Sequence, residues 1–459
     1  MLIRAVANLY NNLTQYDEIR ITTRYVTIKA ILFVVAVLFN STVGLADQTI
    51  LKAGCAKVDI TPPVGVWLSG YGHRNKPSDG ILDKLYAKAM VLDNGQDKIA
   101  IVSTDLLWVP LEITNEVRKQ VKGQIGIPEN NVLICATHTH FGPKIDRITK
   151  NWPDTADSKI DTSYVRTLSK KINDSIVTAY KNLSEAKVGA VKGQIPEVVY
   201  NRRTKKTDGT VEMTFRLPPS SPDLTFGPID PQVCILKVEA TGGALVGAIV
   251  NFACHPVSGD QNRKKFYSIS ADYPGYTAQV IEQTEGGICL FALGTAGDMN
   301  PIRIDRTNPR LQIGRALGAE VLRRIQFVST SGEVTLKGMK KSVTFGLKKT
   351  LPPDRIMDVD KKEKSLTTEI QVLRIGDIYI LGLPGEILVE IGLEIKNKAG
   401  IENLFIISLS NDAIGYVCPR GAYKEGGYEP ERGTNLAEGA GEIITKQALN
   451  IINQMKRSR

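Results

Sequence analysis

The stretch KLYAKAMVLDNGQDKIAIVSTDLL (residues 84–107) decides the fold class, because it holds two apolar runs separated by a turn. Asn94 and Gly95 stand between the runs, and this dipeptide is the strongest short signal for a tight β-hairpin. The stretch therefore predicts two antiparallel strands.

Helical periodicity follows this hairpin. Ile113, Val117 and Val121 recur at helical spacing, and NVLICA (131–136) returns to a strand pattern. Two more helices are indicated by residues at the same spacing: Leu168, Ile172, Ile176 and Leu183, then Leu317, Val321 and Ile325. A second hairpin is predicted at VLRIGDIYILGLP (372–384). This alternation favours an α/β fold: a mixed β-sheet flanked by helices, with added antiparallel hairpins.

The composition is that of a globular protein, with 42% hydrophobic and 23% charged residues among 459. The net charge of +10 comes without a dense Lys/Arg block interleaved with aromatics, which argues against a nucleic-acid partner. The tightest basic cluster is NRRTKK (201–206), which we interpret as a solvated loop. The alternative is that Arg202 and Arg203 face a substrate channel.

Residues 1–46 differ in kind from the rest. Basic residues precede the apolar run AILFVVAVLF (30–39), and Gly44 and Ala46 are small residues suited to a cleavage site. We interpret 1–46 as a secretory signal peptide, with an uncleaved N-terminal anchor as the alternative. Residues 47–459 then form one domain of catalytic size, secreted or periplasmic, in which 331–349 could belong to a smaller subdomain.

The cysteines do not indicate a disulfide scaffold, since there are only six in the whole chain. Four of them lie inside apolar runs, where buried thiols are expected: Cys135, Cys234, Cys254 and Cys289. Because exported proteins can form disulfides, one disulfide among these cysteines is an open alternative. The sequence does not indicate which cysteines would pair.

Polar residues follow several apolar runs, at the points where the predicted strands end. In sheets covered by helices, the crevice beyond the strand ends is where ligands bind. The residues at these ends are His138 and His140, His255, Asp298 and Asn300, Glu386, and Tyr416.

Two of the chain's four histidines occupy ATHTHFGP (136–143). In an extended segment residues i and i+2 point to one face, so His138 and His140 can aim at one point. With His255 and Glu386 they would supply ligands suited to Zn²⁺. Taken alone, His255 could equally be a core histidine and Glu386 a first-turn glutamate, and tyrosine is a rare zinc ligand. The residues by themselves therefore indicate a possible metal hydrolase and nothing narrower.

A set of short motifs, taken in order, resembles the catalytic N-terminal domain of the neutral/alkaline (non-lysosomal) ceramidase family. The similarity covers roughly 51–445 and rests on these motifs: AGCAKVDITPPVG (53–65), GYG (70–72), STDLL (103–107), CATHTHFGP (135–143), NRR (201–203), FACHP (252–256), GDMNP (297–301), PGE (384–386), GYV (415–417) and GGYE (426–429). The resemblance implies a zinc amidohydrolase that cleaves the N-acyl bond of ceramide.

The resemblance also implies roles for individual residues. By position, the zinc ligands would be His138, His255, Glu386 and Tyr416. His140 would lie beside the metal and hydrogen-bond to water or substrate. Tyr428 would steady the developing oxyanion through its hydroxyl.

Several positions depart from the family pattern. Asn300 stands in GDMNP where the family has a serine in Gly-Asp-x-Ser-Pro, and Phe141 replaces a serine after His140. Around His255, CHP (254–256) replaces Thr-His-Ala. Asparagine can hydrogen-bond but cannot act as an alkoxide nucleophile. Attack by metal-activated water tolerates Asn300, which with Tyr428 would hold the oxyanion, whereas a covalent serine mechanism does not.

Three hypotheses follow. The first is a secreted zinc amidohydrolase acting on ceramide or a related N-acyl lipid, with peripheral membrane contact left open. The second keeps the zinc site and changes the substrate to an acylated sugar, a peptide or an ester. The third is a non-catalytic binding protein on the same scaffold.

Overall fold

The computed structural model describes residues 50–145, 159–217, 223–259, 265–303, 307–350 and 364–458. The predicted leader, residues 1–46, lies outside them. The chain from Ile50 onward forms one compact unit. In its described part, no helix combines the length and the apolar character needed to cross a membrane.

The larger of two main sheets has eight strands in the order β14-β12-β11-β6-β1-β3-β4-β5. The pairs at its two edges, β14 with β12 and β4 with β5, are parallel, and the inner pairs are antiparallel. Its strands are β1 (Lys52–Asp59), β3 (Tyr86–Asp93), β4 (Lys98–Thr104), β5 (Val132–Ala136), β6 (Ser184–Gln194), β11 (Gln232–Ala240), β12 (Leu245–Phe252) and β14 (Ile288–Leu293).

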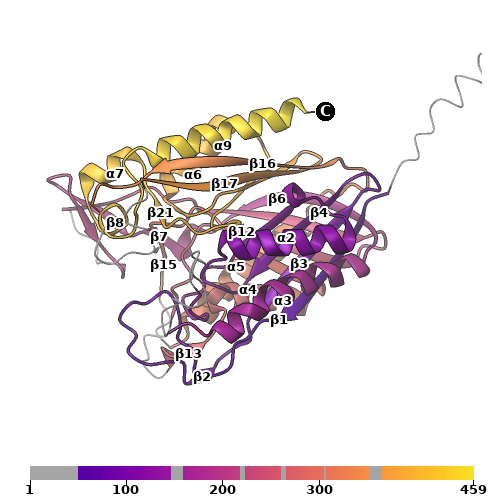
Figure 1. Cartoon of the computed structure of the whole chain (residues 1–459), viewed down its shortest axis with the longest axis horizontal. Helices are drawn as coiled ribbons and strands as arrows, with labels where there is room; N and C mark the ends of the chain where they lie inside the picture. The colour runs from indigo at the N-terminus through magenta and orange to yellow at the C-terminus, as the bar shows by residue number, and fades with distance from the viewer. Residues whose placement is uncertain are drawn as a thin grey trace, which may run out of the picture. The chain divides into compact units, whose positions relative to one another are not determined.

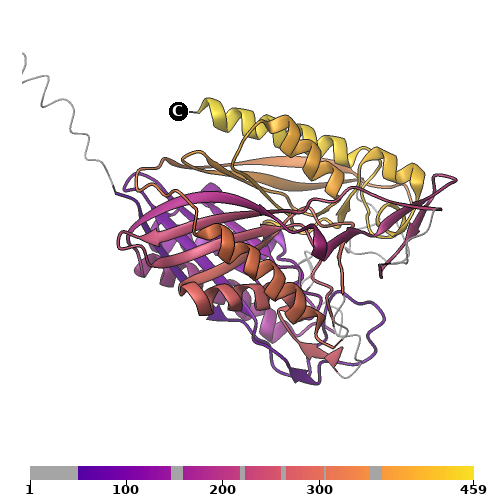
Figure 2. The same ribbon diagram turned by 180° about the vertical axis from the view of Figure 1, so that it is seen from behind.

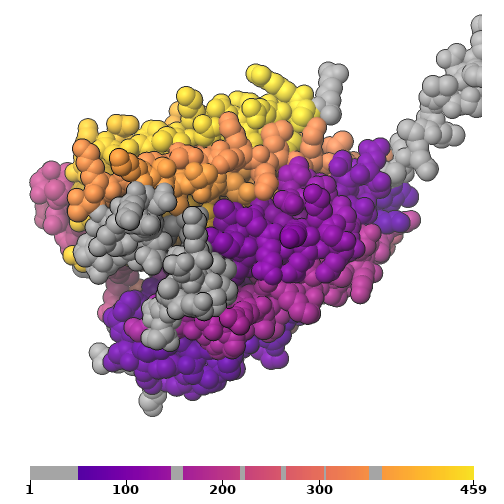
Figure 3. All heavy atoms as spheres, viewed as in Figure 1, coloured from indigo at the N-terminus to yellow at the C-terminus, as the bar shows by residue number. Residues whose placement is uncertain are grey.

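A second sheet of four strands packs against one face of the first. It runs β16 (Leu336–Gly346), β17 (Ser365–Ile375), β18 (Ile378–Gly382) and β20 (Leu404–Ile407), and β18 and β20 are parallel. Alternate side chains of the two sheets interleave in one buried cluster, in which Leu133 and Ile249 of the first sheet join Ile380 and Phe405 of the second. In Figure 3 the C-terminal residues lie as an orange and yellow band directly on the purple part of the chain.

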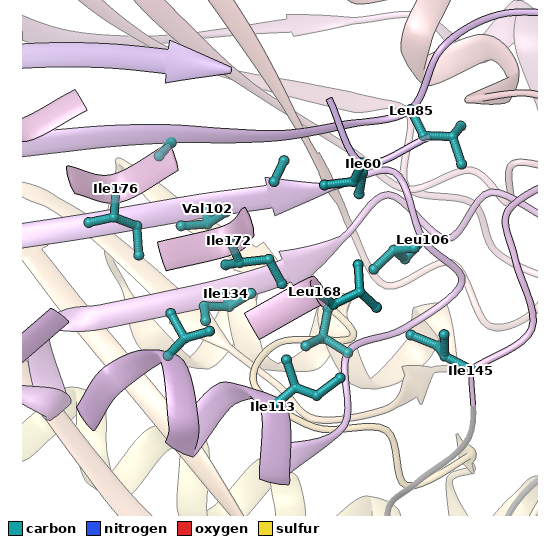
Figure 4. Close-up of a cluster of buried hydrophobic side chains, with 14 of the residues drawn as sticks. Ile60, Leu85, Val102, Leu106, Ile113, Ile134, Ile145, Leu168, Ile172 and Ile176 are labelled. Atoms are coloured by element: carbon teal, nitrogen blue, oxygen red, sulfur yellow. The ribbon is translucent and has the colours of Figure 1, made fainter. Parts of the chain in front are cut away.

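Helices cover the two outer faces and complete four layers (Figures 1 and 2). The first sheet is covered by α2 (Leu111–Ile125), α3 (Thr162–Lys181), α4 (Asp272–Glu285) and α5 (Pro309–Ile325). The second is covered by α6 (Val389–Ala399) and α9 (Ala440–Arg457). Figure 4 shows how Ile113 of α2 and Leu168, Ile172 and Ile176 of α3 turn toward the sheet. The apolar stripe of each helix is therefore what fixes it to its sheet.

Short elements complete the unit, most of them beyond the ends of the main strands. They are β2 (Gly80–Ile81), η1 (Glu129–Asn131), η2 (Pro196–Val198), β7 (Val199–Asn201), β8 (Arg203–Lys206), β9 (Val211–Met213), β10 (Leu224–Phe226), β13 (Ser268–Ile269), β15 (Met299–Pro301), β19 (Glu386–Ile387), β21 (Tyr416–Val417), α7 (Arg420–Glu425) and α8 (Tyr428–Glu431).

The predicted fold class is confirmed. β3 and β4 form the hairpin around Asn94-Gly95, with Asp93 opposite Lys98, and β17 and β18 form the second hairpin. α3 ends at Lys181, before Leu183, and the segment 331–349 contributes β16 to the second sheet. The sequence pattern did not indicate that the strands divide into two stacked sheets. All six cysteines are buried and free.

Candidate metal centre

His138 lies two residues beyond β5, in a backbone conformation that non-glycine residues rarely adopt (φ 67°). Two contacts with the segment after the parallel neighbour β4 hold it there. Its backbone N–H donates to the carbonyl oxygen of Leu106 (2.9 Å), and its ring Nδ1 donates to that of Leu107 (2.8 Å). Because a carbonyl only accepts, Nδ1 carries the ring proton and Nε2 is left as a lone pair.

His255 is held in the same manner beyond β12. Its backbone N–H donates to the carbonyl oxygen of Met299 (2.9 Å), and its Nδ1 donates to that of Ala296 (2.8 Å). Both carbonyls belong to the segment that follows β14, the parallel neighbour of β12. Nε2 of His255 is therefore also an unprotonated lone pair.

Glu386 and Tyr416 reach the same point from the second sheet. They follow β18 and β20, and they lie opposite each other where the short strands β19 and β21 pair in parallel. Burial, followed by the neighbouring Glu386 carboxylate, raises the pKa of the Tyr416 phenol well above its usual range.

The ligand atoms converge within a few ångströms. Nε2 of His138 lies 2.9 Å from Nε2 of His255 and 3.2 Å from Oε2 of Glu386, which is itself 3.5 Å from Nε2 of His255. The Nε2 lone pairs face each other with no proton between them, and Oε2 of Glu386 is buried without a hydrogen-bond partner. A cation between them removes this conflict, and two ligand atoms on one tetrahedral Zn²⁺ lie about 3.3 Å apart. The residues present therefore fit a zinc ion.

His140 lies at the edge of this group, with its Nε2 3.4 Å from that of His138. The three histidines form a cluster with ligand atoms all within 4.8 Å of one another, and their ring nitrogens can hold a metal ion. Burial, and then the neighbouring His138, lowers the pKa of His140 well below its usual value. The ring is therefore neutral near pH 7.

Arg202 connects the predicted site residues. Its Nη2 donates to the Tyr416 hydroxyl oxygen (3.0 Å), its Nη1 to Oδ1 of Asn300 (3.3 Å), and its Nε to Glu429 (2.8 Å). Arg203 pairs with the same Glu429 (3.0 Å). The interpretation of 201–206 as a solvated loop is wrong for both arginines, which are buried because Glu429 neutralises them inside the fold.

Asn300 and Tyr428 lie on the same side as Arg202. Asn300 is in β15, which pairs with β7, and its Oδ1 accepts a hydrogen bond from Nη1 of Arg202. The Tyr428 ring, at the start of α8, lies 5.8 Å from the Tyr416 ring. Asp298 holds this region to α6 by accepting from the backbone N–H of Val389 (2.9 Å), and burial raises its pKa to about 6.

The structure thus brings together the residues that the sequence singled out: His138, His140, His255, Asn300, Glu386, Tyr416 and Tyr428. The expected extended geometry of the His-x-His segment is wrong, because His138 is left-handed and lies beyond the strand. Sequence reasoning offered Arg202 only a possible place on a substrate channel and assigned no role to Glu429, although both lie inside the quoted motifs NRR and GGYE. Phe141 is fully buried and packs against Arg310, whose Cζ lies 4.1 Å from the centre of its ring.

Comparison with known proteins decides the family. The profile described as neutral/alkaline non-lysosomal ceramidase, N-terminal, matches residues 51–301. The chain belongs to this family. A neutral ceramidase of Mycobacterium tuberculosis is 28% identical over 284 residues, which cover 56% of this chain and 39% of that protein. One of Pseudomonas aeruginosa is 24% identical over 267 residues, covering 56% and 38%.

The fold of this ceramidase-family chain also matches a solved structure. The crystal structure of the Pseudomonas aeruginosa neutral ceramidase superposes with a TM-score of 0.72 at 20% sequence identity, over 89% of this chain and 75% of that one. The aligned part of the chain spans about two fifths of the length of the two curated relatives.

Proposed function

We propose that the chain is a zinc-dependent amidohydrolase that cleaves the N-acyl bond of ceramide or a related N-acyl lipid. The observation that carries the proposal is the pair of facing Nε2 lone pairs on His138 and His255, with the unpartnered Oε2 of Glu386 beside them. Membership of the ceramidase family supports the amide substrate.

His138, His255, Glu386 and Tyr416 would hold the metal. The carbonyls of Leu107 and Ala296 fix the two histidine rings, an arrangement typical of metal-ligating histidines. Arg202, donating to the Tyr416 oxygen, offsets part of the rise in the pKa of Tyr416. When bound there, Zn²⁺ supplies a Lewis acid for the carbonyl and lowers the pKa of water.

The remaining residues handle the proton and the developing negative charge. His140, neutral and adjacent to the ligands, accepts a proton and returns it to the leaving amine. Arg202 donates to Oδ1 of Asn300, and the Asn300 amide also hydrogen-bonds the Tyr200 hydroxyl oxygen. The second hydrogen on Nδ2 would donate to the oxyanion together with the Tyr428 hydroxyl. In this scheme Asn300 replaces a serine without loss of function, because no covalent nucleophile is needed.

We further propose that residues 1–46 direct export and that 47–459 is the hydrolase domain, working outside the cytoplasm on a lipid substrate. A cleaved leader is tested by sequencing the N-terminus of the protein recovered from its native host. A mature chain beginning near residue 47 supports export, and an intact Met1 in the membrane fraction supports an anchor.

The proposed function is tested with purified full chain, the variant His138→Ala and the control His73→Ala. His73 is the fourth histidine and is exposed, outside the cluster. Metal content and fatty-acid release are measured on an N-acyl sphingosine, an acylated sugar, an acyl peptide and an ester. We expect about one zinc per chain and turnover of the N-acyl lipid, both lost only in His138→Ala.

The other outcomes separate the alternatives. Turnover of the sugar, peptide or ester in place of the lipid would establish a zinc hydrolase of a different substrate. Zinc bound without turnover of any acyl compound would favour a binding protein. A folded parent that takes up no zinc when offered it would overturn the metal assignment.

A further inference from the structure

A small cavity lies at the beginning of helix α5, away from the metal ligands. Its lining includes Lys265, Tyr276, Asn308, Pro309 and Arg310. The free space is that of about one water-sized sphere. Any occupant must therefore be a single small species.

Arg310 is the unusual member of this lining. It is only 2% exposed, yet its Nε and Nη2 atoms are buried without a hydrogen-bond partner. Its guanidinium carbon lies 4.1 Å from the centre of the Phe141 ring, and the Asp272 carboxylate is 3.8 Å from Nε, beyond hydrogen-bond distance. Guanidinium donors that are buried and unsatisfied are costly, which points to an acceptor in the cavity.

Two nearby acids, Asp272 and Asp83, bond to other donors, and neither forms a hydrogen bond with Nε or Nη2 of Arg310. The Asp272 carboxylate accepts from the hydroxyl of Ser258 and from the backbone N–H groups of Gly259 (3.3 Å) and Tyr273 (2.5 Å). These contacts tie the carboxylate to the segment after β12 and to the first turn of α4.

Asp83 is occupied in the same way. Its oxygens accept from the Ser270 hydroxyl (2.7 Å) and from the backbone N–H of Ala271 (2.5 Å). Both acids therefore have their own donors, whereas Nε and Nη2 of Arg310, a lining residue of the cavity, have no partner.

Three features make the cavity favourable for negative charge. The Arg310 guanidinium and the Lys265 ammonium line it, and so does the positive end of α5. Asn308 caps this 17-residue helix by accepting from the backbone N–H of Leu311 (3.3 Å), and Pro309 is its first residue. A helix N-terminus beside two cationic side chains is suited to an anion.

We propose that this cavity binds one monatomic anion, chloride under physiological conditions. Among anions, the small free space favours a monatomic species over phosphate or a carboxylate. The anion accepts from Arg310 and thereby holds the guanidinium against Phe141, the residue that follows His140. It thus stabilises the layer behind the proton-handling histidine without touching the reacting atoms.

The direct test is crystallographic and uses the full zinc-loaded chain in sodium bromide. We expect an anomalous peak for bromide within about 3.5 Å of the Arg310 guanidinium, in place of chloride. A crystal in high bromide that shows a water molecule, or no density, at this position overturns the proposal.

A solution test uses the thermal midpoint at constant ionic strength, with sodium chloride replacing sodium gluconate. We expect a saturating rise of about 2 °C in the parent, reduced in Lys265→Gln and absent in Arg310→Gln. The control is Arg323→Gln, an exposed arginine on the same helix, which keeps the rise. If Arg310→Gln fails to fold, the parent is compared with Lys265→Gln, because Lys265 is exposed and its substitution should not disturb folding.

Two solution outcomes contradict the proposal. An equal rise in parent and Lys265→Gln would mean that chloride acts elsewhere. A rise with inorganic phosphate but not with chloride would exclude a monatomic site. Neither outcome bears on the metal centre, whose ligands are other residues.

Discussion

The backbone at His138 is strained, and its surroundings show why the strain persists. A left-handed φ at a non-glycine residue costs about 1–3 kcal/mol and survives only where neighbours over-determine it. Here the main chain and the ring of His138 are each tied to a separate carbonyl, those of Leu106 and Leu107. The strained conformation directs Nε2 of His138 at His255. A substitution that moves residues 106–107 would therefore also move this candidate metal ligand.

Asn300 is expected to lower the barrier of the reaction and not to bind the metal. In Asn300→Ala the oxyanion loses one donor, so kcat for the N-acyl substrate should fall about 100-fold with zinc content unchanged. Steady-state kinetics with metal analysis on the same preparation measure both. Because serine keeps a donor, Asn300→Ser should retain more activity than Asn300→Ala. Equal activity in the parent and the alanine variant would remove Asn300 from the mechanism.

Asp105 makes the stability of the fold depend on pH. Burial raises its pKa to about 6, against a value near 3.9 in the unfolded chain. Between these two values the folded state binds more protons than the unfolded state, so the free energy of unfolding falls as pH rises from about 4 to 6. The loss is roughly 2–3 kcal/mol for this one group.

Asp105→Asn removes that titration and should flatten the slope. Urea denaturation between pH 4.5 and 7 measures it. The slope should not vanish, because burial also raises the pKa of Asp83 and Asp298 to about 6. The exposed Asp97→Asn serves as control and should follow the parent, whereas an unchanged slope in Asp105→Asn would contradict the assignment.

At the scale of the element, the loop that carries GYG (70–72) is shaped around the His140 ring. Gly70 has φ 92°, and a Cβ there would lie 2.3 Å from Cγ of His140. Gly72, two residues on, has open space around it. The loop therefore needs glycine at the first position for its contact with His140 and not at the second.

Gly70→Ala should displace the His140 ring and reduce kcat, while the four proposed zinc ligands stay in place. We expect at least a tenfold loss of kcat, since general acid–base catalysis contributes about 10²–10⁴-fold. Zinc content and the kinetics of N-acyl hydrolysis are measured together. Gly72→Ala is the matched control and should keep full activity. A Gly70→Ala protein as active as the parent would separate His140 from the proton transfer.

The sequence predicted those elements whose signals are local. The hairpin around Asn94-Gly95, the stripe of α2 and the placement of polar residues at strand ends depend on neighbours in the chain. The stacking of two sheets does not, and neither does the burial of Arg202, whose partner Glu429 is 227 residues away. Sequence spacing also could not show that His138 leaves the extended conformation, because carbonyls of another segment impose it.

At the scale of the whole molecule, the site joins the two stacked sheets. His138 and His255 follow strands of the first sheet, whereas Glu386 and Tyr416 follow strands of the second. The candidate metal ligands in the described chain therefore come from both stacked sheets. Their lone pairs face one another where the two sheets meet.

Zinc should consequently stabilise the packing of one sheet on the other as well as support catalysis. We expect the thermal midpoint to fall when a chelator removes the metal and to recover when zinc is added. At a free metal concentration 1,000 times Kd, the binding contributes about 4 kcal/mol. His138→Ala and Glu386→Gln remove a ligand from opposite sheets, so each should abolish the zinc-induced rise. His73→Ala, on an exposed histidine, should retain it. A rise that survives in Glu386→Gln would mean that the histidines bind zinc without a ligand from the second sheet. The packing of the two sheets would then depend on their apolar side chains alone.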